Sequence, residues 1–337
     1  MAQGIKITSN NLNGKDGNIT FLPISGGSIT LGVQTLPYTY VTSYPYGEYQ
    51  IKVNDYNYTY SLVVPAPAPL QTAYTQTVQI SYPNAVLSSQ WSITTNSFIA
   101  SKGFSSNTIV YAEGICSDDV DAPKYFGVDN IGQFPTGMNS FLGPFMSGGL
   151  AGYPFVGTVG FGAWASHVAT TSGGTLFMSS MPHIGITQGG DVGRMLRRGK
   201  TGSTTDNTCG AVAGAVGITL TAPSAPSIGD WPDNYQFYKL LDILYPYQSI
   251  LTGMTYGDQM LSATTIIRDS SNTFITNNLP AQTTGSTSND VFFCSGTFIN
   301  TDDGYESYVE VNEFKKFVYS SQTWVDLTSE YMAALLP

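Results

Sequence analysis

Three residues with metal-binding side chains lie on turns that are far apart in the sequence: Cys116, His183 and Cys209. Two thiolates and one imidazole can hold a zinc ion and leave its fourth tetrahedral position to water, as in catalytic zinc sites. The intervals are 67 residues (183 − 116) and 26 residues (209 − 183). Because a zinc finger keeps paired ligands only a few residues apart, this spacing predicts a site that the tertiary fold must assemble.

Each of these residues also has a simpler interpretation. Free cysteine is among the most frequently buried residue types, so Cys116 and Cys209 can be small core residues. His183, in the turn Pro182-His183-Ile184-Gly185, can be a histidine bonded to the backbone. The third cysteine, Cys294, ends the apolar run Val291-Phe292-Phe293 and is predicted to be strand core rather than a ligand.

Composition limits the classes of function. The chain has 337 residues, 42% of them hydrophobic, which is enough for a large globular domain and a smaller one. Its formal net charge of −10 argues against a surface that binds nucleic acid. Only 11% of the residues are charged, a balance more common in particle components and extracellular proteins than in cytosolic enzymes.

The cysteine count and the apolar runs bear on compartment. Three cysteines cannot all pair, so a disulfide framework is not implied and metal ligation suits the count. The N-terminal residues do not have the pattern of a secretory signal, and no run of apolar residues is long enough to span a membrane. We therefore expect no membrane span and leave the location open between the cytoplasm and an assembled particle.

Residues 1–64 are predicted to form a small all-β, sandwich-like domain for assembly or attachment. The runs 4–8, 18–23, 28–33, 37–42, 48–53 and 58–64 are short, β-branched or aromatic, and bounded by turn residues. Residues 47–53 and 58–64, joined by a turn at 54–57, are the best hairpin candidate. The Pro/Ala segment 65–69 has three prolines, which favours an extended linker before a second domain at 70–337.

The second domain mixes predicted strands and helices. Strands are expected at 78–82, at 107–113 leading to Cys116, at 176–178 leading toward His183, and at 290–298. Helices are expected at 233–245 and 256–268, with shorter candidates at 141–150 and 326–336. Ligands on turns after strands are typical of the functional edge of an α/β sheet, so we expect the α/β class.

Several ordered motifs carry a resemblance to a known family. They are residues 147–164, the segment Met181-Pro182-His183-Ile184-Gly185-Ile186, residues 192–199 leading to Cys209-Gly210-Ala211, and residues 296–301 with 305–314. On these motifs the chain resembles the limiting-CO2-inducible B proteins, which are sometimes grouped as theta-type carbonic anhydrases. The resemblance covers roughly residues 80 to 320, and the N-terminal β-domain lies outside it.

The resemblance implies a β-carbonic-anhydrase-like mixed sheet with flanking helices, a homodimer or larger oligomer, and Zn2+ held by Cys116, His183 and Cys209. It also implies a catalytic role for Asp118, which matches the aspartate of the β-type motif Cys-x-Asp-x-Arg. Val120 stands where that motif has arginine, which leaves Arg194, Arg197 and Arg198 as nearby candidates. We assign Asp118, Arg194 and Arg198 as expected catalytic residues.

Two hypotheses about function follow. The first is a zinc-dependent carbonic anhydrase-like protein that interconverts CO2 and bicarbonate through a zinc-bound hydroxide. The second is a structural subunit of a particle or filament. Such a subunit would have the carbonic-anhydrase-like fold, with or without zinc and activity. The low charge content and the added β-domain favour the second, and the two are compatible.

Overall fold

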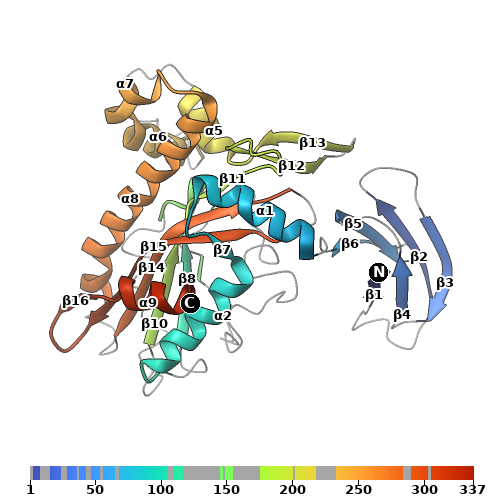
Figure 1. Cartoon of the computed structure of the whole chain (residues 1–337), viewed down its shortest axis with the longest axis horizontal. Coiled ribbons are helices and arrows are strands. Elements are labelled where there is room, and N and C mark those ends of the chain that lie inside the picture. Colours follow the sequence, from blue (N-terminus) through green and yellow to red (C-terminus); the bar gives the residue numbers. More distant parts are fainter. Residues whose placement is uncertain are drawn as a thin grey trace. The chain divides into compact units, whose positions relative to one another are not determined.

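The structure is a computed structural model of the chain (Figure 1). It forms two compact units, one made of residues 1–74, 196–206 and 302–306 and the other of the remaining chain. The residues that it describes are 3–7, 16–23, 29–35, 38–42, 47–53, 56–64, 68–104, 109–114, 116, 145–146, 149–154, 175–199, 202–217, 233–283, 290–302 and 305–337.

The first unit begins with short antiparallel strands. β2 pairs with β3 and β5, β5 pairs with β6, and β1 pairs with β4. The predicted hairpin is present as β5 and β6, with residues 54–55 between them, whereas the domain limits 1–64 and 70–337 stay predictions. The strands are β1 (Gln3–Ile7), β2 (Asp16–Pro23), β3 (Ile29–Thr35), β4 (Tyr38–Thr42), β5 (Gly47–Val53) and β6 (Tyr56–Val64).

The helix α1 (Ala68–Ser81) corrects two expectations. Residues 78–82 were expected to be a strand because they are β-branched and aromatic, but Tyr74, Val78 and Tyr82 are buried four residues apart, which is the helical period. Ala68 and Pro69 lie in the first turn, so an extended linker across 65–69 is wrong at these two residues. Proline fits a first helical turn, where the backbone N–H has no partner within the helix.

The second unit is built on a mixed sheet, as the expected α/β class requires. Within the described residues the strand order is β16-β15-β14-β10-β8-β9, with β11 added to β14 and β7 added to β15. β8, β9, β10, β11 and β14 pair in parallel, and β15 pairs antiparallel with β14, β16 and β7. The bounds are β7 (Val86–Leu87), β8 (Ile109–Gly114), β9 (Phe145–Met146), β10 (Thr175–Ser180), β11 (His183–Gly185), β14 (Val291–Asn300), β15 (Tyr308–Val318) and β16 (Thr323–Asp326).

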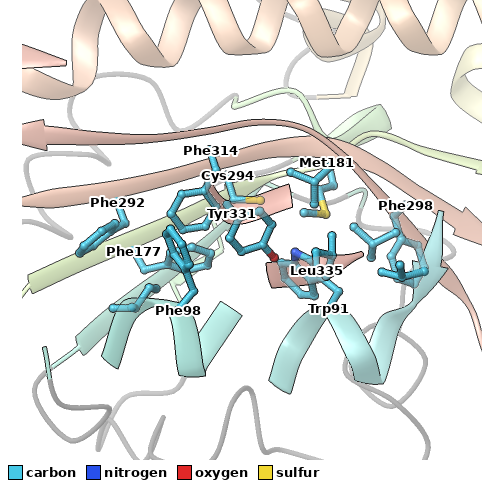
Figure 2. Close-up of a cluster of buried hydrophobic side chains, with 14 of the residues drawn as sticks. Trp91, Phe98, Phe177, Met181, Phe292, Cys294, Phe298, Phe314, Tyr331 and Leu335 are labelled. Atoms are coloured by element: carbon cyan, nitrogen blue, oxygen red, sulfur yellow. The ribbon is translucent and has the colours of Figure 1, made fainter. Parts of the chain in front are cut away.

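One face of this sheet is covered by α2 (Ser88–Ser101) and α9 (Thr328–Leu335). Figure 2 shows the cluster between them, in which Trp91 and Phe98 from α2 and Tyr331 from α9 meet the strand side chains. Tyr331 stacks on Phe314 of β15 with ring centroids 4.2 Å apart. The hydroxyl of Tyr331 also hydrogen-bonds with Thr95, over 2.7 Å, so the polar atom of this buried ring is satisfied.

The opposite face packs on the long helix α8 (Tyr256–Thr283). Leu176 and Met178 of β10 point to this side, whereas Phe177 between them belongs to the other cluster. Every residue of β14 is buried, which is typical of a strand covered on both faces. The remaining described α-helices are α5 (Gly210–Gly217), α6 (Asp233–Leu244) and α7 (Gln248–Leu251), and short 3-10 helices span Leu150–Gly152 and Tyr245–Tyr247. β12 (Arg194–Gly199) pairs with β13 (Gly202–Asn207).

Most of the helices and strands predicted for this unit are confirmed. The strands leading to Cys116 and His183 are β8 and β10, and the helices predicted at 233–245 and 326–336 are α6 and α9. α8 runs to Thr283, beyond the predicted end at 268. The helix expected at 141–150 is wrong, because residues 145–146 form β9 and pair with β8. Among the described residues, no helix combines the length and the apolar character that a membrane crossing requires.

Candidate metal centre

Cys116, His183 and Cys209 come together in the fold. One potential ligand atom from each residue lies within 4.8 Å of those of the other two. All three side chains have an exposed fraction of 0%. The fold thus assembles a group that is spread over 94 positions of sequence (209 − 116 + 1).

Cys116 follows β8 at the end where its parallel neighbour β10 also ends. The N–H of Met181 donates to the carbonyl of Gly114 over 2.8 Å, which joins the ends of the two strands. The turn at Gly152 covers this junction, since a Cβ at Gly152 would lie 3.1 Å from the carbonyl oxygens of both Gly114 and Met181. From this turn the N–H of Ala151 donates to Sγ of Cys116 over 3.1 Å.

His183 begins β11, whose residues pair in parallel with β14. Two backbone hydrogen bonds flank the imidazole, from Phe298 N–H to the Pro182 carbonyl (3.0 Å) and from Ile186 N–H to the Asn300 carbonyl (3.1 Å). On the side chain itself, Nδ1 lies 2.7 Å from Oδ1 of Asn300. His183 is therefore held by backbone pairing on both sides and by a side-chain hydrogen bond at one ring nitrogen.

Cys209 is positioned by two backbone hydrogen bonds, both of which Gly193 makes. The N–H of Gly193 donates to the Gly185 carbonyl over 2.8 Å, and the N–H of Thr208 donates to the Gly193 carbonyl over 3.0 Å. Gly185 has no room for a side chain, because a Cβ there would lie 1.8 Å from Oγ1 of Thr208. This close approach sets the neighbour of Cys209 directly against the strand of His183.

The electrostatic environment of the two thiols depends on burial and on each other. The hydrogen bond with Cys209 and burial raise the pKa of the Cys116 thiol well above its usual range, while the neighbouring His183 lowers it. Cys209 lies directly before α5, and its carbonyl accepts the N–H of Ala213 over 2.9 Å. The positive end of the helix macrodipole favours negative charge at this position.

The donor set and its dimensions fit a zinc ion. Two ligand atoms about 2.3 Å from a tetrahedral zinc lie roughly 3.8 Å apart, so the trio would contract by about 1 Å at most around the ion. Two sulfurs and one imidazole nitrogen are ligands that zinc prefers, and three protein ligands leave one position open. Burial and the neighbouring Cys209 raise the pKa of the Cys116 thiol. A bound cation would act in the opposite direction, because it would stabilise the thiolates.

The residues expected to be catalytic are not assembled in the same way. Asp118 lies outside the described residues, and of Arg198 only the backbone, in β12, is described. Arg194 is exposed, and its guanidinium lies over the ring of Tyr256 with Cζ 5.1 Å from the centroid. The structure thus brings together the three predicted ligands and places the Arg194 side chain on Tyr256.

Two groups at this centre were not predicted as site residues: the backbone N–H of Ala151 and the side chain of Asn300. A backbone donor has no signature in the sequence. Asn300 lies in the motif 296–301, but its residue type alone does not distinguish it from any other strand asparagine. Cys294, by contrast, lies fully buried in β14 among the core residues, which confirms its prediction as strand core.

Comparisons with known proteins agree with this fold. The family of limiting CO2-inducible proteins B/C beta carbonic anhydrases matches residues 85–318. The crystal structure of PtLCIB4, a homologue of the limiting CO2-inducible protein LCIB, has a TM-score of 0.61 and 24% identity, covering 75% of this chain and 98% of that chain.

Two further solved structures are similar to this chain. A point mutant of PtLCIB4 has a TM-score of 0.61 and 23% identity, covering 75% of this chain and 97% of that chain. LCIB itself has a TM-score of 0.49 and 16% identity, covering 73% of this chain and 96% of that chain. A search of curated proteins finds no significant match.

Proposed function

Because the chain belongs to the family of limiting CO2-inducible proteins B/C beta carbonic anhydrases, we propose that it is a zinc-dependent protein that interconverts CO2 and bicarbonate. The observation that carries the proposal is the buried group of Cys116, His183 and Cys209, whose ligand atoms lie within 4.8 Å of one another. These residues would hold the ion and leave one coordination position for the reaction.

These residues would hold a zinc ion, which would supply activated water for attack on CO2 near neutral pH. The two thiolates would balance the charge of the ion, and His183 would bind through a neutral ring nitrogen. Thiolates donate more electron density than imidazoles do, so a group that draws charge from a sulfur would favour the reaction. The N–H of Ala151, which donates to Cys116, is such a group.

Asp118 would orient the attacking water by accepting a hydrogen bond from it. Its place two residues after Cys116 supports this role. An arginine that paired with Asp118 would keep the carboxylate from occupying the open position as a ligand. Because Val120 stands at the usual arginine position, Arg194 or Arg198 would have to supply that partner, and a single Arg-to-Ala variant of each tests the assignment.

Stopped-flow measurement of CO2 hydration tests the proposed activity. Zinc-loaded protein is compared with the buffer rate and with His183→Ala treated in the same way. We expect a rate above buffer for the wild type and a rate equal to buffer for the variant. A wild-type rate equal to buffer at every pH from about 7 to 9, the range in which zinc-activated water forms, would contradict the enzymatic proposal.

A structural role is the second proposal, and a specific observation favours it. Residues 1–84 lie outside the family match, and their described part includes six strands that could serve assembly. A homodimer or a larger homo-oligomer, such as a filament or particle, would then be the working form. Sedimentation velocity of the full chain over a range of concentrations measures this. A single monomeric species throughout would contradict the assembly role without bearing on zinc.

A further inference from the structure

We propose that Asn300 is a positioning residue that fixes the tautomer of His183 and so makes Nε2 the nitrogen that binds the metal. The proposal rests on the proposed zinc site and deepens it. Asn300 is the last residue of β14, and its side chain is fully buried beside the imidazole. Neither the family match nor the sequence motifs assign it a role.

The chemistry of the contact decides the tautomer. Nδ1 of His183 lies 2.7 Å from Oδ1 of Asn300, which is a short hydrogen bond. An amide oxygen only accepts, so the proton of this bond must be on Nδ1. A neutral imidazole carries one N–H, and Nε2 therefore keeps its lone pair. A metal ligand requires such a lone pair, and both atoms lie where water has no access to compete.

The second ring nitrogen, Nε2, is the one that does not contact the Asn300 amide oxygen. Nε2 is inaccessible to solvent, and one potential ligand atom of His183 lies within 4.8 Å of those of Cys116 and Cys209. The imidazole thus has Asn300 at Nδ1 and both cysteines close by. With Nδ1 occupied by the amide, Nε2 is the nitrogen that can complete the trio.

The backbone of Asn300 is held independently of its side chain. Asn300 pairs with Gly185 in the register of β11 and β14, and its carbonyl accepts the N–H of Ile186 over 3.1 Å. A substitution at this position keeps both backbone interactions. Loss of the amide would therefore release the ring of His183 while the strands that carry both residues remain paired.

An amide differs from the carboxylate that often supports a metal-bound histidine. Two thiolates, one neutral imidazole and a divalent ion sum to zero charge. Asn300 adds none, whereas an aspartate would add a buried negative charge. Asn300→Asp keeps the hydrogen-bond acceptor, and Asn300→Ala removes it. Comparing the two variants separates the effect of the hydrogen bond from the effect of side-chain volume.

Nitrogen-15 NMR of the histidine side chains tests the tautomer directly. The chain has only two histidines, so two imidazole patterns are expected, and His167→Gln assigns the signals of His183. In metal-free wild type we expect the Nδ1–H form. Asn300→Asp should retain a proton on Nδ1, and Asn300→Ala should lose the preference. An Nε2–H form in the wild type overturns the proposal, even if Asn300→Ala does not fold.

Zinc affinity, measured by chelator competition, is the second readout. Loss of such an outer partner typically weakens metal binding by about 10–100-fold, so we expect this for Asn300→Ala and near wild-type affinity for Asn300→Asp. Asn278→Ala is the control. Asn278 lies on α8, and the hydrogen bond seen for its side chain goes to the carbonyl of Phe274. Unchanged affinity in Asn300→Ala overturns the proposal. A wild type with the Nδ1–H form that binds no zinc would instead contradict the metal site itself.

Discussion

The backbone N–H of Ala151 donates to Sγ of Cys116 over 3.1 Å, and Ala151 adopts a left-handed conformation to do so (φ 56°, ψ 18°). Apart from Ala151, only Gln322 among the described non-glycine residues has positive φ. This conformation costs about 1–2 kcal/mol for a residue with a Cβ. Strain of this kind persists where the surroundings require it, and here it places a donor on a predicted metal ligand.

Substitution of Ala151 should separate strain from the hydrogen bond. Ala151→Gly keeps the N–H and removes the strain but adds freedom to the unfolded chain, so we expect a stability change within about 1 kcal/mol and unchanged zinc affinity. Ala151→Val places a β-branched residue at positive φ in a fully buried position, which should cost about 1–3 kcal/mol and weaken zinc binding. Urea unfolding and chelator competition measure both. Equal behaviour of the two variants would contradict this account.

Zinc content should depend on two of the three cysteines only. Cys116→Ala and Cys209→Ala each remove a ligand, so we expect bound zinc to fall from about one ion per chain to near zero, as for open three-ligand sites. Cys294→Ala is a matched control, since this thiol is equally buried but belongs to the core of β14. Elemental analysis after gel filtration gives the stoichiometry. A loss of zinc in the Cys294 variant would show that burial alone explains the effect.

Gly185 and Gly210 form a matched pair for the close approach at the site. An added methyl at Gly185 would lie 1.8 Å from Oγ1 of Thr208 and 2.6 Å from the carbonyl oxygen of Arg194. We expect Gly185→Ala to cost about 1–3 kcal/mol or more and to move Cys209 from the other ligands. At Gly210, the first residue of α5, nothing lies within 4 Å.

The control should therefore behave in the opposite way. Gly210→Ala should stabilise the protein by about 0.4–1 kcal/mol, because it restricts the unfolded chain and enters open space. Thermal unfolding of metal-free protein measures stability, and zinc titration measures the site. Normal zinc affinity in Gly185→Ala would mean that the Gly185, Gly193 and Thr208 backbone contacts do not position Cys209.

Glu310 should make stability depend on pH in a direction opposite to that of most carboxylates. Burial raises its pKa, although the Asn84 N–H, 3.2 Å from Oε1, and the charge of Arg268 lower it. A pKa raised in the folded state means that the folded protein binds the proton more tightly. The contribution to stability is thus complete below the unfolded pKa and is lost as pH rises through the folded value.

The variant Glu310→Gln tests this direction. It removes the half-buried charge and keeps an oxygen for the Asn84 N–H, so at pH 7 we expect it to be at least as stable as the wild type. That advantage should shrink as pH falls toward about 4, the ordinary range of glutamate. Urea unfolding at several pH values gives the difference, and an advantage that grows on acidification would contradict the assignment.

Much of the α/β unit follows from local patterns. The apolar run at 290–298 and the runs leading to Cys116 and His183 predict strands, and those strands are present as β14, β8 and β10. The element at 78–82 was wrong because a short β-branched run can fit either a strand or a helix. What decides is burial at Tyr74, Val78 and Tyr82, which depends on packing that a local window does not contain.

The amino-acid sequence by itself determined which potential ligands are present: two thiols and an imidazole on turns. They are side chains that zinc binds, and they are too far apart in the sequence for a zinc finger. Only the tertiary structure decided that Asn300 meets Nδ1 of His183 and that the N–H of Ala151 meets Cys116. The physical reason is that a ligand is a property of a side chain, which residue type reveals. A supporting hydrogen bond is a property of geometry between distant segments, and a backbone donor is common to almost every residue.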